Sequence, residues 1–151
     1  MNDKELELIK TAMLHEDEGA EYYMLQSKQW HEAQVSENFR ALAEEEKMHA
    51  RWIRELFEER KSFGDAKLLS FMKEHKSPKL FDWTDVKKIS DLNVKDVFKK
   101  AMDMEEASYK YYQDVKASSE DPDMNNLLDI LINWEISHYK SLKEVYDTLT
   151  A

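Results

Sequence analysis

Residues 42–53 read LAEEEKMHARWI, and residues 131–142 read LINWEISHYKSL. Each stretch contains the pattern Glu-x-x-His, which begins at Glu46 in the first and at Glu135 in the second. In an α-helix, residues three positions apart are separated by about 300° around the axis and by about 4.5 Å along it. Both side chains of such a pair therefore face one point, as two ligands of one metal ion would.

Both stretches lie in segments whose apolar residues recur at alternating steps of three and four, which is typical of helices packed in a bundle. Four such segments occur, at about residues 4–31, 36–60, 94–118 and 122–149. Each apolar seam is interrupted near its middle, either by one Glu or by Glu and His. The interrupting residues are Glu16, Glu46, His49, Glu105, Glu135 and His138. We therefore expect the six side chains to meet at one level of the bundle.

Composition favours an all-α fold, since charged residues make up 36% of the 151 residues and the chain has only two Gly and two Pro. The connections after the first and the third helix are short, which predicts antiparallel neighbours. Asp121 is placed to cap the fourth helix just before Pro122. Residues 61–93 form a long crossover between the two helical pairs. The sequence thus predicts one domain over residues 1–151, a four-helix bundle of two antiparallel hairpins joined by this crossover.

An internal repeat relates the two hairpins. Residues separated by 89 positions match in three pairs, namely Glu16 with Glu105, Glu46 with Glu135, and His49 with His138. Tyr23 and Tyr112 are related by the same separation. The halves therefore represent a duplicated helical hairpin with approximate two-fold symmetry.

Four glutamates and two histidines inside an apolar bundle need compensation, because an unpaired buried carboxylate costs several kcal/mol. The chain has no cysteine, which excludes thiolate metal sites, iron–sulfur clusters and disulfides. Two divalent cations that share carboxylates would neutralise the cluster, whereas protonated, hydrogen-bonded acids are the alternative without metal. Gly19, one turn after Glu16, leaves room either for an exogenous oxygen ligand or for close helix packing.

Four segments carry a resemblance to a known family: HEDEGAEYY (15–23), LAEEEKMHA (42–50), DMEEASYKYY (103–112) and NWEISHYK (133–140). Together they resemble the ferritin-like di-iron superfamily, most closely its rubrerythrin-related branch, over nearly the whole chain. The resemblance implies a ferritin-like bundle in which the six interrupting residues bind two iron ions, with manganese or zinc as other options. It also implies that Tyr23 and Tyr112 lie near the site.

Two departures from rubrerythrin bear on the expected activity. Rubrerythrin carries a rubredoxin domain whose cysteines hold a further iron, so we expect this chain to take electrons from an external donor such as a rubredoxin-like protein. Rubrerythrin also has an additional Glu one turn after the third-helix ligand, where this chain has Ser108.

These features predict an oxidoreductase that reduces hydrogen peroxide or dioxygen at a di-iron site. An iron-binding or storage protein and an interaction module with a structural metal are the alternatives. The net charge of −10 opposes binding to nucleic acid or to an anionic membrane. We expect a cytoplasmic protein, and the resemblance implies a homodimer. The histidines His15, His31 and His75 and the run Glu44-Glu45 are expected to be solvated.

Overall fold

The computed structural model describes residues 3–30, 33–58, 72–75 and 92–150. Four long helices account for nearly all of them: α1 (Asp3–Gln29), α2 (Ala33–Glu58), α4 (Leu92–Ala117) and α5 (Pro122–Thr150). A further helical turn spans residues 72–74 of the crossover, and the described part of the chain contains no strand. The predicted all-α helical bundle is therefore confirmed.

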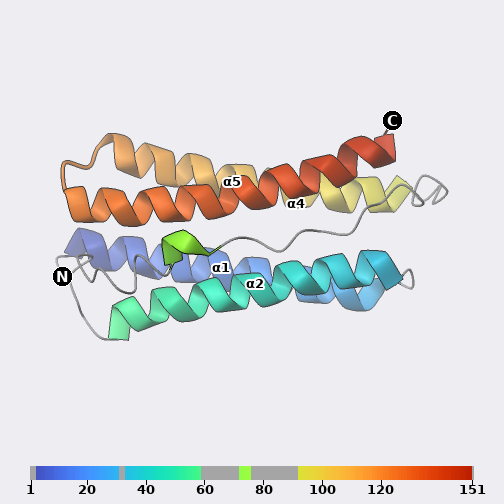
Figure 1. Ribbon diagram of the computed structural model, residues 1–151, viewed down its shortest axis with the longest axis horizontal. Coiled ribbons are helices and arrows are strands. Elements are labelled where there is room, and N and C mark those ends of the chain that lie inside the picture. Colours follow the sequence, from blue (N-terminus) through green and yellow to red (C-terminus); the bar gives the residue numbers. More distant parts are fainter. Residues whose placement is uncertain (1–2, 31–32, 59–71, 76–91, 151) are drawn as a thin grey trace.

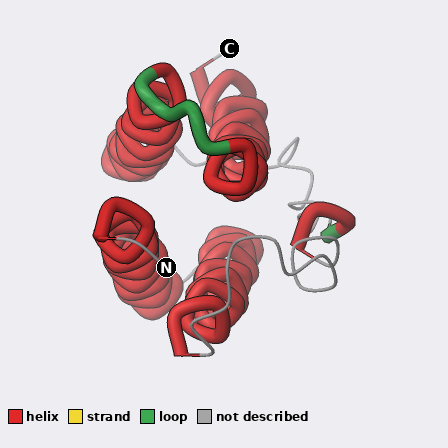
Figure 2. Tube along the Cα trace, turned by 90° about the vertical axis from the view of Figure 1, so that its left-hand side faces the viewer, coloured by secondary structure: helices red, strands yellow, loops and turns green. Residues whose placement is uncertain are grey.

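The helices form two antiparallel hairpins, α1 with α2 and α4 with α5, which lie one above the other in Figure 1. Seen end-on, the four helices occupy the corners of a square, and the turn at residues 72–74 lies at one side of it (Figure 2). None of the described helices combines the length and apolar character needed to cross a bilayer.

Apolar side chains form two clusters, one toward each end of the bundle. One contains Ile9 on α1 and Leu128 on α5, and the other contains Phe39 on α2 and Phe98 on α4, all fully buried. The rings of the two phenylalanines lie 4.9 Å apart between centroids. Burial of each such side chain contributes about 1.5–3 kcal/mol. The two clusters leave the middle of the bundle to the polar residues of the seams.

Local contacts fix the start of α5 and the position of the crossover turn. Asp121 Oδ1 accepts hydrogen bonds from the backbone N–H groups of Asp123 at 3.0 Å and Met124 at 3.5 Å, so Asp121 caps α5 as its sequence position predicts. The indole N–H of Trp134 donates to the carbonyl oxygen of Met72 at 3.3 Å. Met72 itself is fully buried, so residues 72–75 are anchored on the bundle beside α5.

Candidate metal centre

The six side chains that interrupt the apolar seams meet in the middle of the bundle and are at most 4% exposed. They form two groups, in each of which one ligand atom per residue lies within 4.8 Å of the others. The first group contains Glu16, Glu46 and His49, and the second contains Glu46, Glu105, Glu135 and His138. Glu46 belongs to both, so the arrangement is that of two adjacent sites that share one carboxylate.

Both histidines turn the same ring nitrogen toward these carboxylates. His138 Nδ1 lies 2.9 Å from Glu46 Oε1 and 3.4 Å from Glu105 Oε1. His49 Nδ1 lies 3.5 Å from Glu16 Oε2. Each Glu-x-x-His pair also contributes both of its residues to one group, Glu46 with His49 to the first and Glu135 with His138 to the second, as the spacing of three residues in a helix predicts.

Several polar atoms of the cluster find no hydrogen-bond partner within the described part of the chain. Those that face the candidate sites are both carboxylate oxygens of Glu16, Oε2 of Glu105, and Nδ1 of His49 and of His138. Leaving such groups buried and unpaired is costly, because they have lost their contact with water. Carboxylate oxygens and imidazole nitrogens are suitable donors for divalent iron, manganese or zinc. The residues therefore fit a pair of metal ions.

In the absence of metal, protons offset part of the charge. Burial, together with the neighbouring Glu105 and Glu16, raises the pKa of Glu135 well above its usual value. Burial disfavours the charged ring of His138, but the carboxylates of Glu105 and Glu45 outweigh it and raise its pKa to about 10. Metal ions and protons consequently compete for the same cluster.

The two symmetry-related tyrosines have different partners. The hydroxyl of Tyr23 donates to Glu105 Oε1 at 2.6 Å, and burial and the charge of Glu105 raise the pKa of Tyr23 well above its usual value. Tyr23 therefore keeps its proton and orients a candidate ligand. The hydroxyl of Tyr112 lies 3.3 Å from His15 Nδ1. His15 is half-buried against Tyr111 and Tyr112, although the sequence indicated a solvated side chain.

The space beside Gly19 is filled by a candidate ligand. A Cβ atom at this position would lie 3.3 Å from Cδ and 3.4 Å from Oε2 of Glu46. Of the two interpretations left open by the sequence, this contact supports close helix packing, because Gly19 on α1 lies directly against the Glu46 side chain of α2. The missing Cβ makes room for the carboxylate shared by both groups.

Two residues expected to be solvated lie against the candidate centre. Glu45 is only 3% exposed, and its Oε1 lies 3.2 Å from His138 Nε2 and 3.4 Å from His49 Nε2. His75 Nε2 lies 3.5 Å from the same oxygen, and its ring packs edge-on against His49. The expectation was wrong for Glu45, because residues 72–75 cover this side of α2, whereas His75 remains partly exposed, with 22% of its side chain accessible. The internal repeat contained one indication that the position of Glu45 is buried, because the equivalent residue in the second half is the apolar Trp134. His31 lies outside the described residues.

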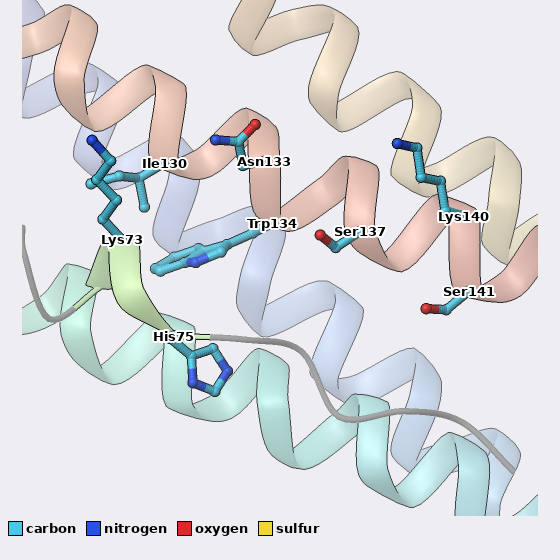
Figure 3. A pocket seen from close by; sticks show the side chains of 8 residues that line it. All are labelled: Lys73, His75, Ile130, Asn133, Trp134, Ser137, Lys140 and Ser141. Carbon is cyan, nitrogen blue, oxygen red and sulfur yellow. The ribbon is translucent and has the colours of Figure 1, made fainter.

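A cavity of about 380 Å³ lies next to these residues, between the crossover turn and α5. Its lining includes Lys73 and His75 from the crossover and Trp134 and Lys140 from α5. Figure 3 shows Trp134 projecting from α5 toward the turn that carries Lys73 and His75. The indole of Trp134 stacks on the ring of His49 at 3.8 Å and 7°. Trp134 and His75 thus stand between the cavity and the candidate centre.

A family model described as rubrerythrin matches residues 7–146, a range that includes all six candidate ligands. The comparisons with curated proteins and with solved structures give no match.

Proposed function

Because the chain belongs to the rubrerythrin family, we propose that it is a di-iron oxidoreductase that reduces hydrogen peroxide or dioxygen with electrons from an external donor. The observation that carries this proposal is the buried cluster of four glutamates and two histidines, contributed by all four helices. Its polar atoms without partners and its shared Glu46 are what two adjacent metal ions require.

The grouping of the side chains suggests how two ions would be held. Glu16 and His49 would bind one ion, Glu105, Glu135 and His138 would bind the other, and Glu46 would contact both. When bound, two ferrous ions supply one electron each, which together reduce peroxide to water.

The remaining contributions come from the protein itself. Tyr23 keeps the carboxylate of Glu105 oriented through its 2.6 Å hydrogen bond. The two apolar clusters separate the candidate metal centre from bulk water at both ends of the bundle. Exclusion of water strengthens the electrostatic interactions among the carboxylates and histidines of the centre. Each reduction of peroxide consumes two protons and two electrons. The chain has no cysteine to hold a further redox iron, so a protein such as a rubredoxin would restore the ferrous state.

Reconstitution with ferrous iron under anaerobic conditions tests the proposal. We expect two irons per chain after desalting, rapid oxidation on mixing with hydrogen peroxide, and loss of both in Glu105→Ala. Glu106→Ala is the matched control, because Glu106 is the next residue but pairs with Lys110 at the surface. Absence of retained iron in the wild-type protein, or oxidation no faster than in Glu105→Ala, would contradict the proposal.

Two other outcomes would assign a different role to the same cluster. We propose a homodimer, so a shell of many subunits in light scattering would favour iron storage instead. Metal that raises the free energy of unfolding without any redox turnover would favour an interaction module in which the metal is structural. Competition among iron, manganese and zinc would identify the metal that the site prefers.

A further inference from the structure

Glu45 contacts both candidate ligand histidines although it belongs to neither of the two groups described above. A single oxygen, Oε1, lies 3.2 Å from Nε2 of His138 and 3.4 Å from Nε2 of His49. These are the ring nitrogens that point away from the candidate ligand carboxylates, since each Nδ1 faces the cluster. The side chain of Glu45 is 1% exposed, so water does not compete for these contacts.

A histidine can bind a metal ion through one ring nitrogen while the other carries a proton and donates it to a neighbouring acceptor. That acceptor fixes both the tautomer and the orientation of the ring. We propose that Glu45 is a positioning residue that holds both histidines with Nε2 protonated and with Nδ1 directed at the metal ions. The inference rests on the proposed metal centre and adds a carboxylate that binds no metal itself.

The internal repeat explains why one carboxylate serves two histidines. The position equivalent to Glu45 in the second half is Trp134, so the symmetric arrangement with one carboxylate for each histidine does not exist. Trp134 instead stacks on the ring of His49 at 3.8 Å and covers its face. The ring of His49 is thereby held by an aromatic neighbour on its face and by Glu45 at its edge.

His75 completes the arrangement from outside the bundle. Its Nε2 lies 3.5 Å from Glu45 Oε1, and its ring also packs edge-on against Trp52 with centroids 5.2 Å apart. The crossover turn thus supplies a third imidazole that keeps the carboxylate of Glu45 in place. His75 lines the cavity whose side chains Figure 3 draws, and 22% of its side chain is exposed, so it is the outermost member of the set.

Glu45, His49 and His75 are also close enough to hold a metal ion of their own. Such an ion would need Nε2 of His49, whose Nδ1 already faces Glu16 in the first group. Both nitrogens of one imidazole would then have to lose their protons. Positioning requires only the ordinary neutral ring, so the geometry favours it over a third metal site.

The test compares Glu45→Gln with Glu44→Gln, a matched control whose carboxylate is exposed and pairs with Lys47. Zinc serves as the probe because it is diamagnetic. Zinc per chain is counted, affinity is measured against a chromophoric chelator, and two-bond ¹H–¹⁵N spectra identify the bound nitrogen of each histidine. We expect two zinc ions bound through Nδ1 in the wild-type protein and the control. In Glu45→Gln we expect affinity to fall about 10- to 100-fold, with shifted Nε2 resonances.

His75→Gln should lower zinc affinity less than Glu45→Gln, with both histidines still bound through Nδ1. Two zinc ions in the wild-type protein and unchanged affinity in Glu45→Gln would overturn this inference alone. A third zinc ion in the wild-type protein that is lost in both Glu45→Gln and His75→Gln would overturn the inference, because it would show that Glu45, His49 and His75 bind a metal ion themselves. Absence of zinc and iron from the wild-type protein would overturn the proposed function as well. If Glu45→Gln fails to fold, Glu45→Asp retains the charge on a shorter side chain and should show the same loss of affinity.

Discussion

Substituting Gly19 by alanine should raise the stability of the metal-free protein while weakening its binding of metal. Alanine is more favourable than glycine in a helix interior by about 1 kcal/mol. For a chain of this size, that change corresponds to a rise in melting temperature of about 2–4 °C. The gain is reduced by the new contact, because the added Cβ would lie 3.3 Å from Cδ of Glu46 and this side chain must retreat by a few tenths of an ångström.

The same retreat disturbs both candidate ligand groups, since Glu46 belongs to each of them. Displacements of about 0.5 Å are enough to impair a binding site. We therefore expect metal affinity to fall about tenfold, which corresponds to about 1.4 kcal/mol. Thermal unfolding of the metal-free protein, followed by circular dichroism, measures the change in melting temperature. Competition with a chelator for ferrous iron or zinc measures the change in metal affinity.

Ser108→Ala is the control, because Ser108 occupies the equivalent position of the repeat and the change removes an atom instead of adding one. It should leave metal affinity unchanged. Wild-type affinity in Gly19→Ala would refute the argument that glycine is needed to accommodate Glu46. A metal-free Gly19→Ala protein less stable than wild type by more than about 1 kcal/mol would show instead that helix packing requires the glycine.

Three further predictions concern stability. The folded pKa of His138 is about 10 against an ordinary value of 6.5, so its contribution to the metal-free protein is complete below about pH 6.5 and is lost as pH rises through 10. The urea midpoint of the metal-free protein should therefore fall between pH 7 and pH 10, and a constant midpoint would contradict this assignment. Tyr23→Phe removes the donor to Glu105 and should lower the free energy of unfolding by about 1–3 kcal/mol in urea titrations, whereas a change near zero would mean that the hydrogen bond contributes nothing. Asp121→Ala removes the cap of α5 and should lower the free energy of unfolding by about 1 kcal/mol with no effect on metal affinity. A loss of metal affinity in this variant would show that the cap and the metal centre are linked.

The sequence determined the helical class and the level at which the polar residues meet. Alternating steps of three and four identify one face of a helix, because the helical repeat is a local property of the backbone. Glu46 and His49 could be placed on the same face for this reason, and the repeat at 89 residues placed their counterparts Glu135 and His138 opposite them. The structure brings these residues together with Glu16 and Glu105, as the spacing predicts.

Tertiary structure alone decided the surroundings of the two histidines. The period of α2 places Glu45 beside the seam, where a carboxylate is ordinarily solvated, but it does not show which segment packs over that side. The turn at residues 72–75 covers it, carries His75 to Glu45, and rests on Trp134. Likewise, symmetry made Tyr23 and Tyr112 equivalent, whereas Tyr23 donates to Glu105 and Tyr112 lies beside His15 and not on Glu16, the equivalent carboxylate. Helical periodicity specifies which side chains share a face, but burial depends on contacts between segments that are distant in the chain.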